Sequence, residues 1–256
     1  MKKRLDQYLV ELGLSETRSK ATSLIKDGKV LLAGEIVKKG SIKISEEEAQ
    51  QVTVSSHDVF VGRGAKKLLG AIENFQLNVE GLVCTDIGAS TGGFTEVLLN
   101  HGAARVYAID VGRDQLAKKL REDERVINFE GVNIRHGIEL DEKTDFLVAD
   151  LSYISLRLVL KEMLSLLKEN GRGVILVKPQ FEVGKSFVGK GGIVKDMDKV
   201  RETLNEIYDL FEEHGAFLKD LMKSTITGKT GNQEYLFYFD LGLKESLKSK
   251  NHLESL

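Results

Sequence analysis

From about residue 61 onward, short apolar runs alternate with longer stretches of helical spacing, and this alternation constrains the fold more than any other feature. The run LVCTDI, which begins at Leu82, is typical of a buried strand, and apolar residues at helical intervals follow it. Parallel strands need a crossover between them, which is usually a helix. We therefore predict an α/β domain whose mostly parallel sheet has helices on both faces.

The apolar runs and the turn residues between them set the expected boundaries. The predicted helices run from Gly92 to His101, Asp114 to Arg121, Ser155 to Lys168 and Asp198 to His214. The predicted strands cover about residues 82–87, 105–110, 126–129, 145–150, 173–178, 216–226 and 234–241. Only a turn separates the last two strands, so we expect the final strand to be antiparallel. Seven strands with that ending resemble the Rossmann-like fold of S-adenosylmethionine-dependent methyltransferases.

A smaller module precedes this domain. We assign it residues 1–60, give the α/β domain residues 61–245, and treat residues 246–256 as a tail. The module begins with two amphipathic helices, the second of them capped by Ser15. Short β-rich runs between residues 30 and 54 then predict a small twisted sheet. The module is therefore expected to be a compact αβ unit.

Charge is distributed unevenly along the chain, although 37 Lys and Arg against 39 Asp and Glu leave a formal net charge of only -2. Residues 1–43 hold ten basic and five acidic side chains, a local balance of 10 - 5 = +5. Such a segment is typical either of nucleic-acid binding or of an ordinary solvated surface.

The remaining composition favours a protein of the cytoplasm without a metal. The single cysteine, Cys84, lies in an apolar run and cannot form an intramolecular disulfide, which fits a reducing compartment. The five histidines are scattered without the spacing of a zinc site. The sequence shows neither a signal peptide nor a stretch of about 18 uncharged residues, so we expect no membrane span.

Three short motifs mark the N-terminal module: R-L-D-x-x-L from Arg4, T-R-S-x-A from Thr17 and I-x-x-G-x-V from Ile25. Together they resemble the S4 RNA-binding domain, in which the second helix and the following turn present basic side chains to structured RNA. Arginine and lysine suit contacts with phosphate, which supply position and affinity. The resemblance implies RNA contacts by Arg4, Arg18, Lys20 and Lys26.

A glycine-rich loop, GASTGG from Gly88 to Gly93, joins the first strand of the α/β domain to the helix that follows. Ligands of such sheets bind at the carboxyl ends of the strands, where helix N-termini offer free amides. The loop fits the hydrolase pattern G-x-S-x-G, but the sequence supplies no upstream oxyanion loop. It fits the dinucleotide pattern G-x-G-x-x-G weakly, because Ser90 stands in place of the second glycine.

Two acids complete the pattern around this loop. Asp86 precedes it in D-x-G-x-x-x-G-G, and Asp110 ends the next strand, where a carboxylate can bond ribose hydroxyls. The arrangement resembles S-adenosylmethionine methyltransferases, whose ligand needs close backbone approach and no phosphate cradle. Asn133 is placed to meet the adenine, and Phe94 or Tyr153 to line the cofactor or a flipped base. The implied cofactor contacts are Asp86, Gly88, Ala89, Ser90, Thr91, Gly92, Gly93, Phe94, Asp110, Val111, Asn133 and Asp150.

A second glycine-rich stretch is VGKSFVGKGG from Val183. Within it, Gly184-Lys185-Ser186 matches the last three residues of a Walker A motif. The first glycine of that motif falls on Pro179, which excludes a P-loop. We interpret the stretch as a basic loop over the active site, where an RNA backbone contacts Lys185, Lys190 and Lys195.

Six longer motifs point to one family. They are R-G-A-x-K-L from Arg63, D-I-G-A-S-T-G-G-F-T from Asp86, D-V-G-x-x-Q-L from Asp110, D-L-S-Y-I-S-L from Asp150, V-K-P-Q-F-E from Val177 and G-N-x-E-Y from Gly231. Over about residues 3–241 the chain resembles the TlyA-type ribosomal RNA methyltransferases, often labelled haemolysin A, which join an S4 domain to an FtsJ-like catalytic domain. The resemblance implies 2'-O-methylation of ribose, with cytidine as substrate, S-adenosylmethionine as methyl donor and ribosomal RNA or subunits as partner. It also implies an RNA contact by Arg63 and a catalytic tetrad of Lys67, Asp150, Lys178 and Glu234.

The four tetrad residues also make chemical sense on their own. Asp150 and Lys178 end neighbouring strands, Glu234 enters the last strand and Lys67 begins a helix, so all four can meet at one sheet edge. A ribose hydroxyl needs a base to take its proton. The pKa of a free lysine is about 10.4, but burial and a second ammonium group nearby both lower a lysine pKa. We predict that Lys178 is the base, that Lys67 tunes its charge, and that the carboxylates orient the lysines and the hydroxyl.

Two other functions stay open at this point. A non-catalytic ribosome-assembly factor would bind RNA through the S4 domain, and it is favoured if the four tetrad residues do not converge. A membrane-lytic protein, which the haemolysin label suggests, fits poorly because the sequence shows neither a secretion signal nor an apolar amphipathic segment. The sequence does not specify the oligomeric state.

Overall fold

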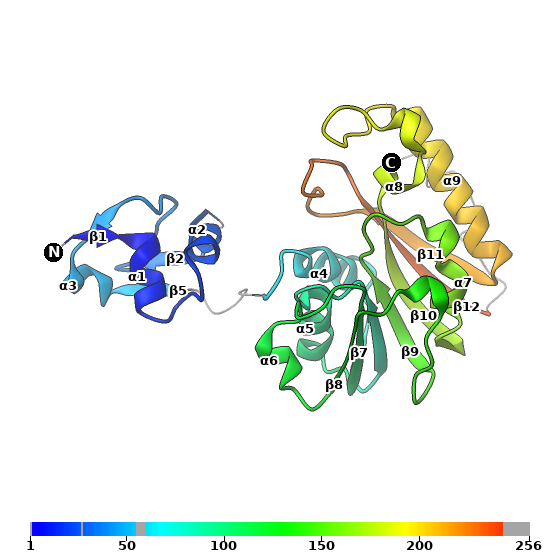
Figure 1. The fold of residues 1–256 in the computed structure, drawn as a ribbon, viewed down its shortest axis with the longest axis horizontal. Helices are drawn as coiled ribbons and strands as arrows, with labels where there is room; N and C mark the ends of the chain where they lie inside the picture. Colours follow the sequence, from blue (N-terminus) through cyan, green and yellow to red (C-terminus); the bar gives the residue numbers. More distant parts are fainter. Residues whose placement is uncertain (1, 27, 55–59, 243–256) are drawn as a thin grey trace. The chain divides into compact units, whose positions relative to one another are not determined.

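The structure, a computed structural model of the 256-residue chain, describes residues 2–26, 28–54 and 60–242. It divides into two units, residues 1–59 and residues 60–256, which are described separately (Figure 1). The predicted tail, residues 246–256, lies outside the described residues.

The N-terminal unit has an apolar centre enclosed by short helices and strands. Its buried core includes Leu5, Leu9, Ile25 and Val30. Within the described residues its helices are α1 (Leu5–Glu11), α2 (Arg18–Lys26) and α3 (Glu46–Ala49). An antiparallel pair joins β1 (Lys3–Arg4) to β4 (Lys43–Ile44), and a three-stranded antiparallel sheet has the order β3 (Glu35–Ile36), β2 (Val30–Leu32), β5 (Val52–Val54).

The start of α2 differs from the prediction. Ser15 does not cap the helix, because its hydroxyl donates to the carbonyl of Thr17 at 3.0 Å. Thr17 serves instead, since its hydroxyl oxygen accepts from the backbone N–H of Lys20 at 3.2 Å. Helix α3 was not predicted, and it begins with a reciprocal capping box between Ser45 and Glu48.

The C-terminal unit is built on a twisted sheet whose strand order, within the described residues, is β11-β12-β10-β9-β6-β7-β8. All neighbouring pairs from β10 to β8 are parallel, whereas β12 is antiparallel to both β10 and β11, as predicted. The strands are β6 (Val83–Ile87), β7 (Arg105–Asp110), β8 (Val126–Glu130), β9 (Thr144–Ala149), β10 (Leu167–Val177), β11 (Ala216–Lys223) and β12 (Tyr235–Leu241).

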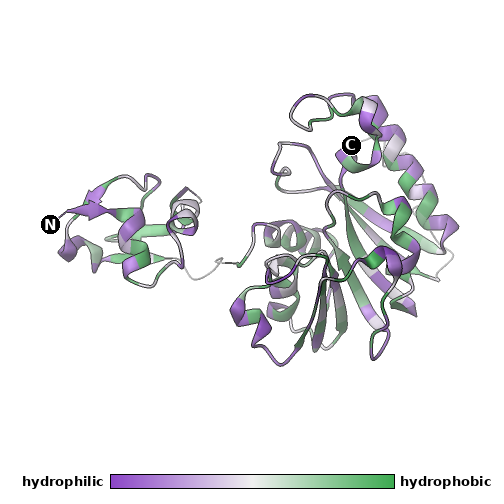
Figure 2. Ribbon diagram, viewed as in Figure 1, coloured by the Kyte–Doolittle hydropathy of each residue, from purple (hydrophilic) through white to green (hydrophobic). Residues whose placement is uncertain are grey.

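Helices cover both faces of this sheet and bury two apolar clusters (Figure 1). Leu68 of α4 and Val97 of α5 belong to one cluster, and Met163 of α7 and Ile207 of α9 belong to the other. Figure 2 shows green and purple residues alternating along α9, as expected for a helix with one face on the sheet. The helices are α4 (Ala65–Asn74), α5 (Gly93–Asn100), α6 (Lys118–Arg121), α7 (Leu160–Leu164), α8 (Pro179–Glu182) and α9 (Met197–Glu213).

Two predicted helices are shorter than expected. The segment Ser155 to Lys168 forms a 3-10 helix, Leu156–Leu158, followed by α7, and β10 already begins at Leu167, which pairs with Thr144 of β9. The predicted helix therefore ends early, because Leu167 pairs with β9 instead of continuing the helix.

The predicted helix from Asp114 to Arg121 is reduced to α6 for a different reason. The backbone N–H groups of Asp114, Gln115 and Leu116 all donate to the carboxylate of Glu130, at 2.6 to 3.2 Å. Asp114 also has a φ of 55°, which a right-handed helix does not allow, and α6 begins only at Lys118.

The structure leaves no room for a side chain at Gly173 of β10. A Cβ at this position would collide with the carbonyl oxygen of Leu147 and lie 2.9 Å from the ring of Phe239. We expect Gly173→Ala to lower the free energy of unfolding by about 1–3 kcal/mol, because neither the backbone nor the ring can move away freely. Urea unfolding at equilibrium would measure this change, and an unchanged midpoint would contradict it.

Candidate active site

Four predicted side chains come together at the carboxyl edge of the sheet. Asp150 directly follows β9, Lys178 follows β10, Glu234 precedes β12 and Lys67 lies on α4. The Nζ atom of Lys67 lies 3.2 Å from Oδ2 of Asp150 and 2.7 Å from Oε2 of Glu234. The Nζ atom of Lys178 lies 2.5 Å from Oδ1 of Asp150. The four therefore form one continuous chain of ion pairs, Glu234 to Lys67 to Asp150 to Lys178.

This chain of ion pairs is largely removed from water. The side chains of Lys67, Lys178 and Glu234 are 9%, 8% and 3% exposed, and that of Asp150 is 20% exposed. Two ammonium groups and two carboxylates sum to 2 - 2 = 0, so no net charge is buried. Removal of any one member would leave an uncompensated charge in a medium that solvates it poorly.

Lys67, and not the adjacent Lys66, supplies the helical lysine of this network. Lys66 contributes its backbone carbonyl, which accepts from the hydroxyl of Thr225 at 3.1 Å. The two residues lie on different sides of α4, because successive helical positions are about 100° apart. Sequence adjacency alone did not distinguish them.

The backbone at Lys178 is extended, with φ -113° and ψ 103°, as expected for a residue before proline. Its Nζ also donates to the hydroxyl of Ser152 at 2.8 Å. The ring of Phe181 lies beside it, with its centroid 6.0 Å from Nζ. The hydroxyl of Ser152, the carboxylate of Asp150 and one aromatic face thus lie around this ammonium group.

The glycine-rich loop leaves the sheet beside these residues. Gly88 has a φ of 83°, and a Cβ there would lie 2.9 Å from the carbonyl oxygen of Asp150. Gly92, with a φ of 93°, would place a Cβ against the side chains of Leu116 and Leu120. Glycine is needed at both positions, so that the loop can turn tightly beside the end of β9.

Asp110 links this loop to the next one along the sheet. Its Oδ2 accepts from the backbone N–H of Ser90 at 2.8 Å, and its Oδ1 accepts from that of Gly112 at 2.6 Å. Each oxygen keeps a further lone pair for a ribose hydroxyl. The adjacent Val111 is 69% exposed, which leaves an apolar surface beside the carboxylate. Asn133 is exposed, and its amide oxygen accepts from the N–H of Arg135 at 3.1 Å.

Asp86 and Phe94 lie behind the loop. Phe94 is 3% exposed and belongs to the apolar core, and Asp86 is completely buried. Oδ2 of Asp86 accepts from both the N–H and the hydroxyl of Thr95, at 2.8 and 2.7 Å, whereas its Oδ1 has no partner among the described residues. Burial raises the pKa of Asp86 to about 7, although the hydrogen bonds from Thr95 oppose this shift.

Two of the four predicted RNA contacts of the N-terminal unit, Arg4 and Arg18, lie near the buried Asp6. Arg4 and Arg18 approach Oδ2 of Asp6 at 2.6 and 3.5 Å, and the hydrogen bond from Arg4 lowers the pKa of this carboxyl. Lys20 pairs with Glu16, and the side chain of Lys26 is exposed. Asp6 therefore anchors two arginines whose side chains remain about half exposed, at 42% and 56%.

In the C-terminal unit the predicted RNA contacts are also exposed. Arg63 donates to the carbonyl of Thr227 at 2.6 Å. Lys185, Lys190 and Lys195 lie on an exposed glycine-rich segment between α8 and α9.

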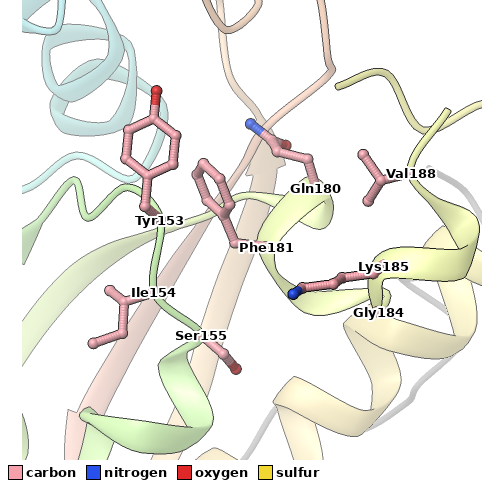
Figure 3. Close-up of a pocket in the computed structure, with 8 residues that line it drawn as sticks. All are labelled: Tyr153, Ile154, Ser155, Gln180, Phe181, Gly184, Lys185 and Val188. Atoms are coloured by element: carbon pink, nitrogen blue, oxygen red, sulfur yellow. The ribbon is translucent and has the colours of Figure 1, made fainter. Parts of the chain in front are cut away.

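An open pocket of about 430 Å³ is lined in part by Phe181, whose ring also lies near Nζ of Lys178 (Figure 3). Tyr153 is 92% exposed and has a φ of 66°, a conformation that costs a tyrosine energy. Its ring lies 5.3 Å from that of Phe181, centroid to centroid, at an angle of 51°. The lining residues are Tyr153, Ile154, Ser155, Gln180, Phe181, Gly184, Lys185 and Val188.

Three residues whose side chains make contacts in this region were not predicted: Ser152, Glu182 and Glu96. Ser152 accepts from Lys178, as above, and Glu182 accepts from the hydroxyl of Ser155 and the N–H of Leu156, at 2.6 and 2.8 Å. Ser152 and Glu182 stand within motifs quoted above, but a motif does not tell which hydroxyl or carboxyl turns inward. Glu96 accepts from the N–H of Val61 at 2.6 Å and pairs with an exposed lysine, and no sequence signal marked it.

None of the helices in the described residues is both long and apolar enough to span a membrane. Across the same residues, His, Cys, Asp and Glu form no group of three or more that could hold a metal ion.

Comparison with known families now decides the relationship. Residues 60–241 match the FtsJ-like methyltransferase family, and residues 3–49 match the S4 domain. The chain belongs to the TlyA-type FtsJ-like methyltransferases. It is 41% identical over 250 residues to the 16S/23S rRNA (cytidine-2'-O)-methyltransferase TlyA of Mycobacterium tuberculosis, covering 96% of this chain and 93% of that one. It is 40% identical to Hemolysin A of Brachyspira hyodysenteriae, covering 92% and 99%.

Two solved structures are similar to this chain over most of its length. A protein of Streptococcus thermophilus named as a hemolysin matches with a TM-score of 0.76 and 35% identity, over 99% of this chain and 94% of that one. An S-adenosylmethionine-dependent methyltransferase from Mesorhizobium loti matches with a TM-score of 0.51 and 13% identity, over 67% and 95%. The second match shows the shared fold alone.

The buried Asp86 predicts a pH dependence of stability. The unfolded carboxyl ionises near its ordinary value of 3.8, whereas the folded one holds its proton to about pH 7. Its stabilising contribution is therefore largest below pH 4 and is lost as the pH rises to about 7. Asp86→Asn keeps an oxygen for Thr95 and cannot ionise, so we expect it to gain stability relative to the natural protein over this range. Urea unfolding at pH 4.5, 6 and 8 would measure the difference, and parallel curves would contradict it.

Proposed function

We propose that this protein methylates the 2'-hydroxyl of a cytidine in ribosomal RNA, with S-adenosylmethionine as methyl donor and Lys178 as general base. The observation that carries the proposal is the convergence of Lys67, Asp150, Lys178 and Glu234 beside the glycine-rich loop. The relatives named as rRNA (cytidine-2'-O)-methyltransferases support the substrate. The S4 domain supports binding to structured RNA.

The loop region fits the methyl donor chemically. Gly88 and Gly92 let the loop turn tightly against the protein at this edge, and Asp110 lies at the same edge with lone pairs to spare. The exposed Val111 offers an apolar surface for an adenine ring. These residues would hold S-adenosylmethionine, which supplies a methyl group activated by a sulfonium.

Lys178 is placed to remove a proton from a ribose hydroxyl. As a neutral amine it has one lone pair, which can accept that proton as the oxygen becomes nucleophilic. Asp150 then holds the resulting ammonium at 2.5 Å, so the charge formed on Lys178 is stabilised where it appears. Lys67 shares the same carboxylate, and Glu234 balances Lys67.

The RNA would be held by groups of both units. The exposed charges of Arg4, Arg18, Lys20 and Lys26, and of Arg63, Lys185 and Lys190, suit phosphate contacts. The open pocket suits the base of the target nucleotide, because the face of Tyr153 is free to stack and Phe181 leads back to Lys178 (Figure 3). An enzyme with this substrate would act in the cytoplasm, on ribosomal RNA or on subunits.

Convergence of the tetrad favours this enzyme over a non-catalytic assembly factor. An RNA-binding scaffold would have no need for a neutral four-charge network at the edge of a cofactor-type sheet, because buried ion pairs contribute little net stability. The name Hemolysin A, carried by one relative, finds no matching feature in the described part of this chain, where no helix could cross a membrane.

The general base is tested by replacing Lys178. We expect Lys178→Ala to lower the rate of methyl transfer to ribosomal RNA at least ~100-fold, because general base catalysis contributes that much or more. Transfer of labelled methyl to purified large and small subunits, followed by isolation of the modified nucleoside, would measure it. Lys66→Ala is the matched control, with activity expected within about twofold of the natural protein. Full activity of Lys178→Ala would remove Lys178 as the base.

The aromatic pocket is tested at Tyr153. We expect Tyr153→Ala to raise the KM for RNA about tenfold, because stacking on an aromatic side chain contributes about 1–3 kcal/mol per base. Tyr153→Phe keeps the ring and should keep the KM. Binding of S-adenosylmethionine, measured by calorimetry, should be the same in both variants. An equal KM for the Ala and Phe variants would argue against stacking.

A further inference from the structure

We propose that Ser152 is a positioning residue for the methyl-transfer reaction, whose hydroxyl aims the lone pair of Lys178 at the ribose. The inference rests on the function proposed above and extends it to a residue outside the tetrad. It is drawn from the 2.8 Å hydrogen bond between Nζ of Lys178 and Oγ of Ser152. Ser152 itself is exposed, on the loop between Asp150 and the pocket.

A neutral lysine amine has two N–H bonds and one lone pair, arranged tetrahedrally with the bond to Cε. Within the described residues, Nζ of Lys178 donates to Oγ of Ser152 at 2.8 Å, whereas Oδ1 of Asp150 lies 2.5 Å from Nζ as an ion-pair partner and forms no hydrogen bond. When one N–H points at Ser152 and the other is turned toward the carboxylate, the lone pair is left in the one remaining direction.

Asp150 alone would not fix that direction. Its Oδ1 pairs with Nζ without a hydrogen bond, so the amine could rotate about the Cε–Nζ bond, and either an N–H or the lone pair would then face the substrate. An N–H turned toward the ribose oxygen would donate to it and leave the hydroxyl proton without an acceptor. The hydrogen bond to the hydroxyl of Ser152 removes this freedom, and the amine of Lys178 is then preorganised for proton transfer.

A hydroxyl suits this task better than a second carboxylate. Asp150 is in direct contact with Lys178, and Glu234 lies beyond Lys67. The two negative charges of these acids balance the two positive charges of the lysines while both lysines are protonated. Another negative charge at Nζ would favour the ammonium, which has no lone pair to offer. The hydroxyl of Ser152 holds an N–H and leaves this charge balance unchanged.

Ser152 is also held firmly enough to act in this way. At the start of its loop, the N–H of Asp150 donates to the carbonyl of Ile87 at 3.1 Å. At the end of the loop, Ser155 and Leu156 both donate to Glu182, on the helix that directly follows Lys178. The loop and the lysine are therefore tied to the same short segment. Tyr153, with its positive φ, turns its ring outward directly after Ser152.

The test compares Ser152→Ala with Ser152→Thr in the full-length protein, using ribosomal subunits as substrate and labelled S-adenosylmethionine. We expect Ser152→Ala to lower kcat about tenfold, in keeping with the loss of one hydrogen bond to an amine. The KM for RNA and the Kd for S-adenosylmethionine should stay within about twofold of the natural values. Ser152→Thr keeps the hydroxyl and should restore most of kcat. Ser165→Ala, an exposed hydroxyl at the end of α7, is the control for loss of a serine elsewhere.

The outcomes separate this inference from the function on which it rests. If the natural protein transfers methyl and Lys178→Ala does not, but Ser152→Ala keeps full kcat, the positioning role is wrong and the proposed function stands. A rise in KM for Ser152→Ala with unchanged kcat would also overturn the positioning role, because it would indicate an RNA contact. If the natural protein transfers no methyl to RNA, the proposed function itself fails.

Discussion

The carboxylate of Asp150, shared between two lysines, is the interaction on which the site depends. One oxygen faces Lys67 and the other faces Lys178, at 3.2 and 2.5 Å. Because Asp150 directly follows β9, the central position of that strand fixes where both ammonium groups meet. The same residue also meets the glycine-rich loop, since its carbonyl oxygen is what excludes a side chain at Gly88. Asp150 therefore contacts the two lysines and the glycine-rich loop, and its position is set by the end of β9.

The order of strands explains why distant residues meet there. Strands β6, β9 and β10 are neighbours and parallel, so the residues that follow them reach the same edge although they are far apart in sequence. The antiparallel β12 enters at this edge instead of leaving it, which brings Glu234 alongside residues that follow parallel strands. A fully parallel sheet would place the start of its last strand at the opposite edge. The reversed strand is therefore a condition for a four-residue network.

The fold and the meeting of Lys67, Asp150, Lys178 and Glu234 at one sheet edge were predictable, because both depend on which residues end or begin strands. Apolar runs marked those strands, and the position of Lys178 before the only proline fixed its backbone. The missed features depend on contacts distant in sequence. Glu130 unwound the start of the helix predicted from Asp114 by accepting three backbone N–H groups, and no local pattern shows this. The role of Ser152 likewise depends on a turn at Tyr153 that runs against the conformational preference of tyrosine.

Asp86 shows how the same edge separates two kinds of carboxyl. Asp150 lies between two ammonium groups, whereas Asp86, near the end of a neighbouring strand, accepts from the neutral groups of Thr95. Burial without a cation raises the pKa of Asp86 to about 7, and its second oxygen has no partner among the described residues. A second buried anion close to Asp150 would compete with it for Lys67 and Lys178. While Asp86 holds its proton, it therefore adds no further anion beside the ion pairs that Asp150 makes.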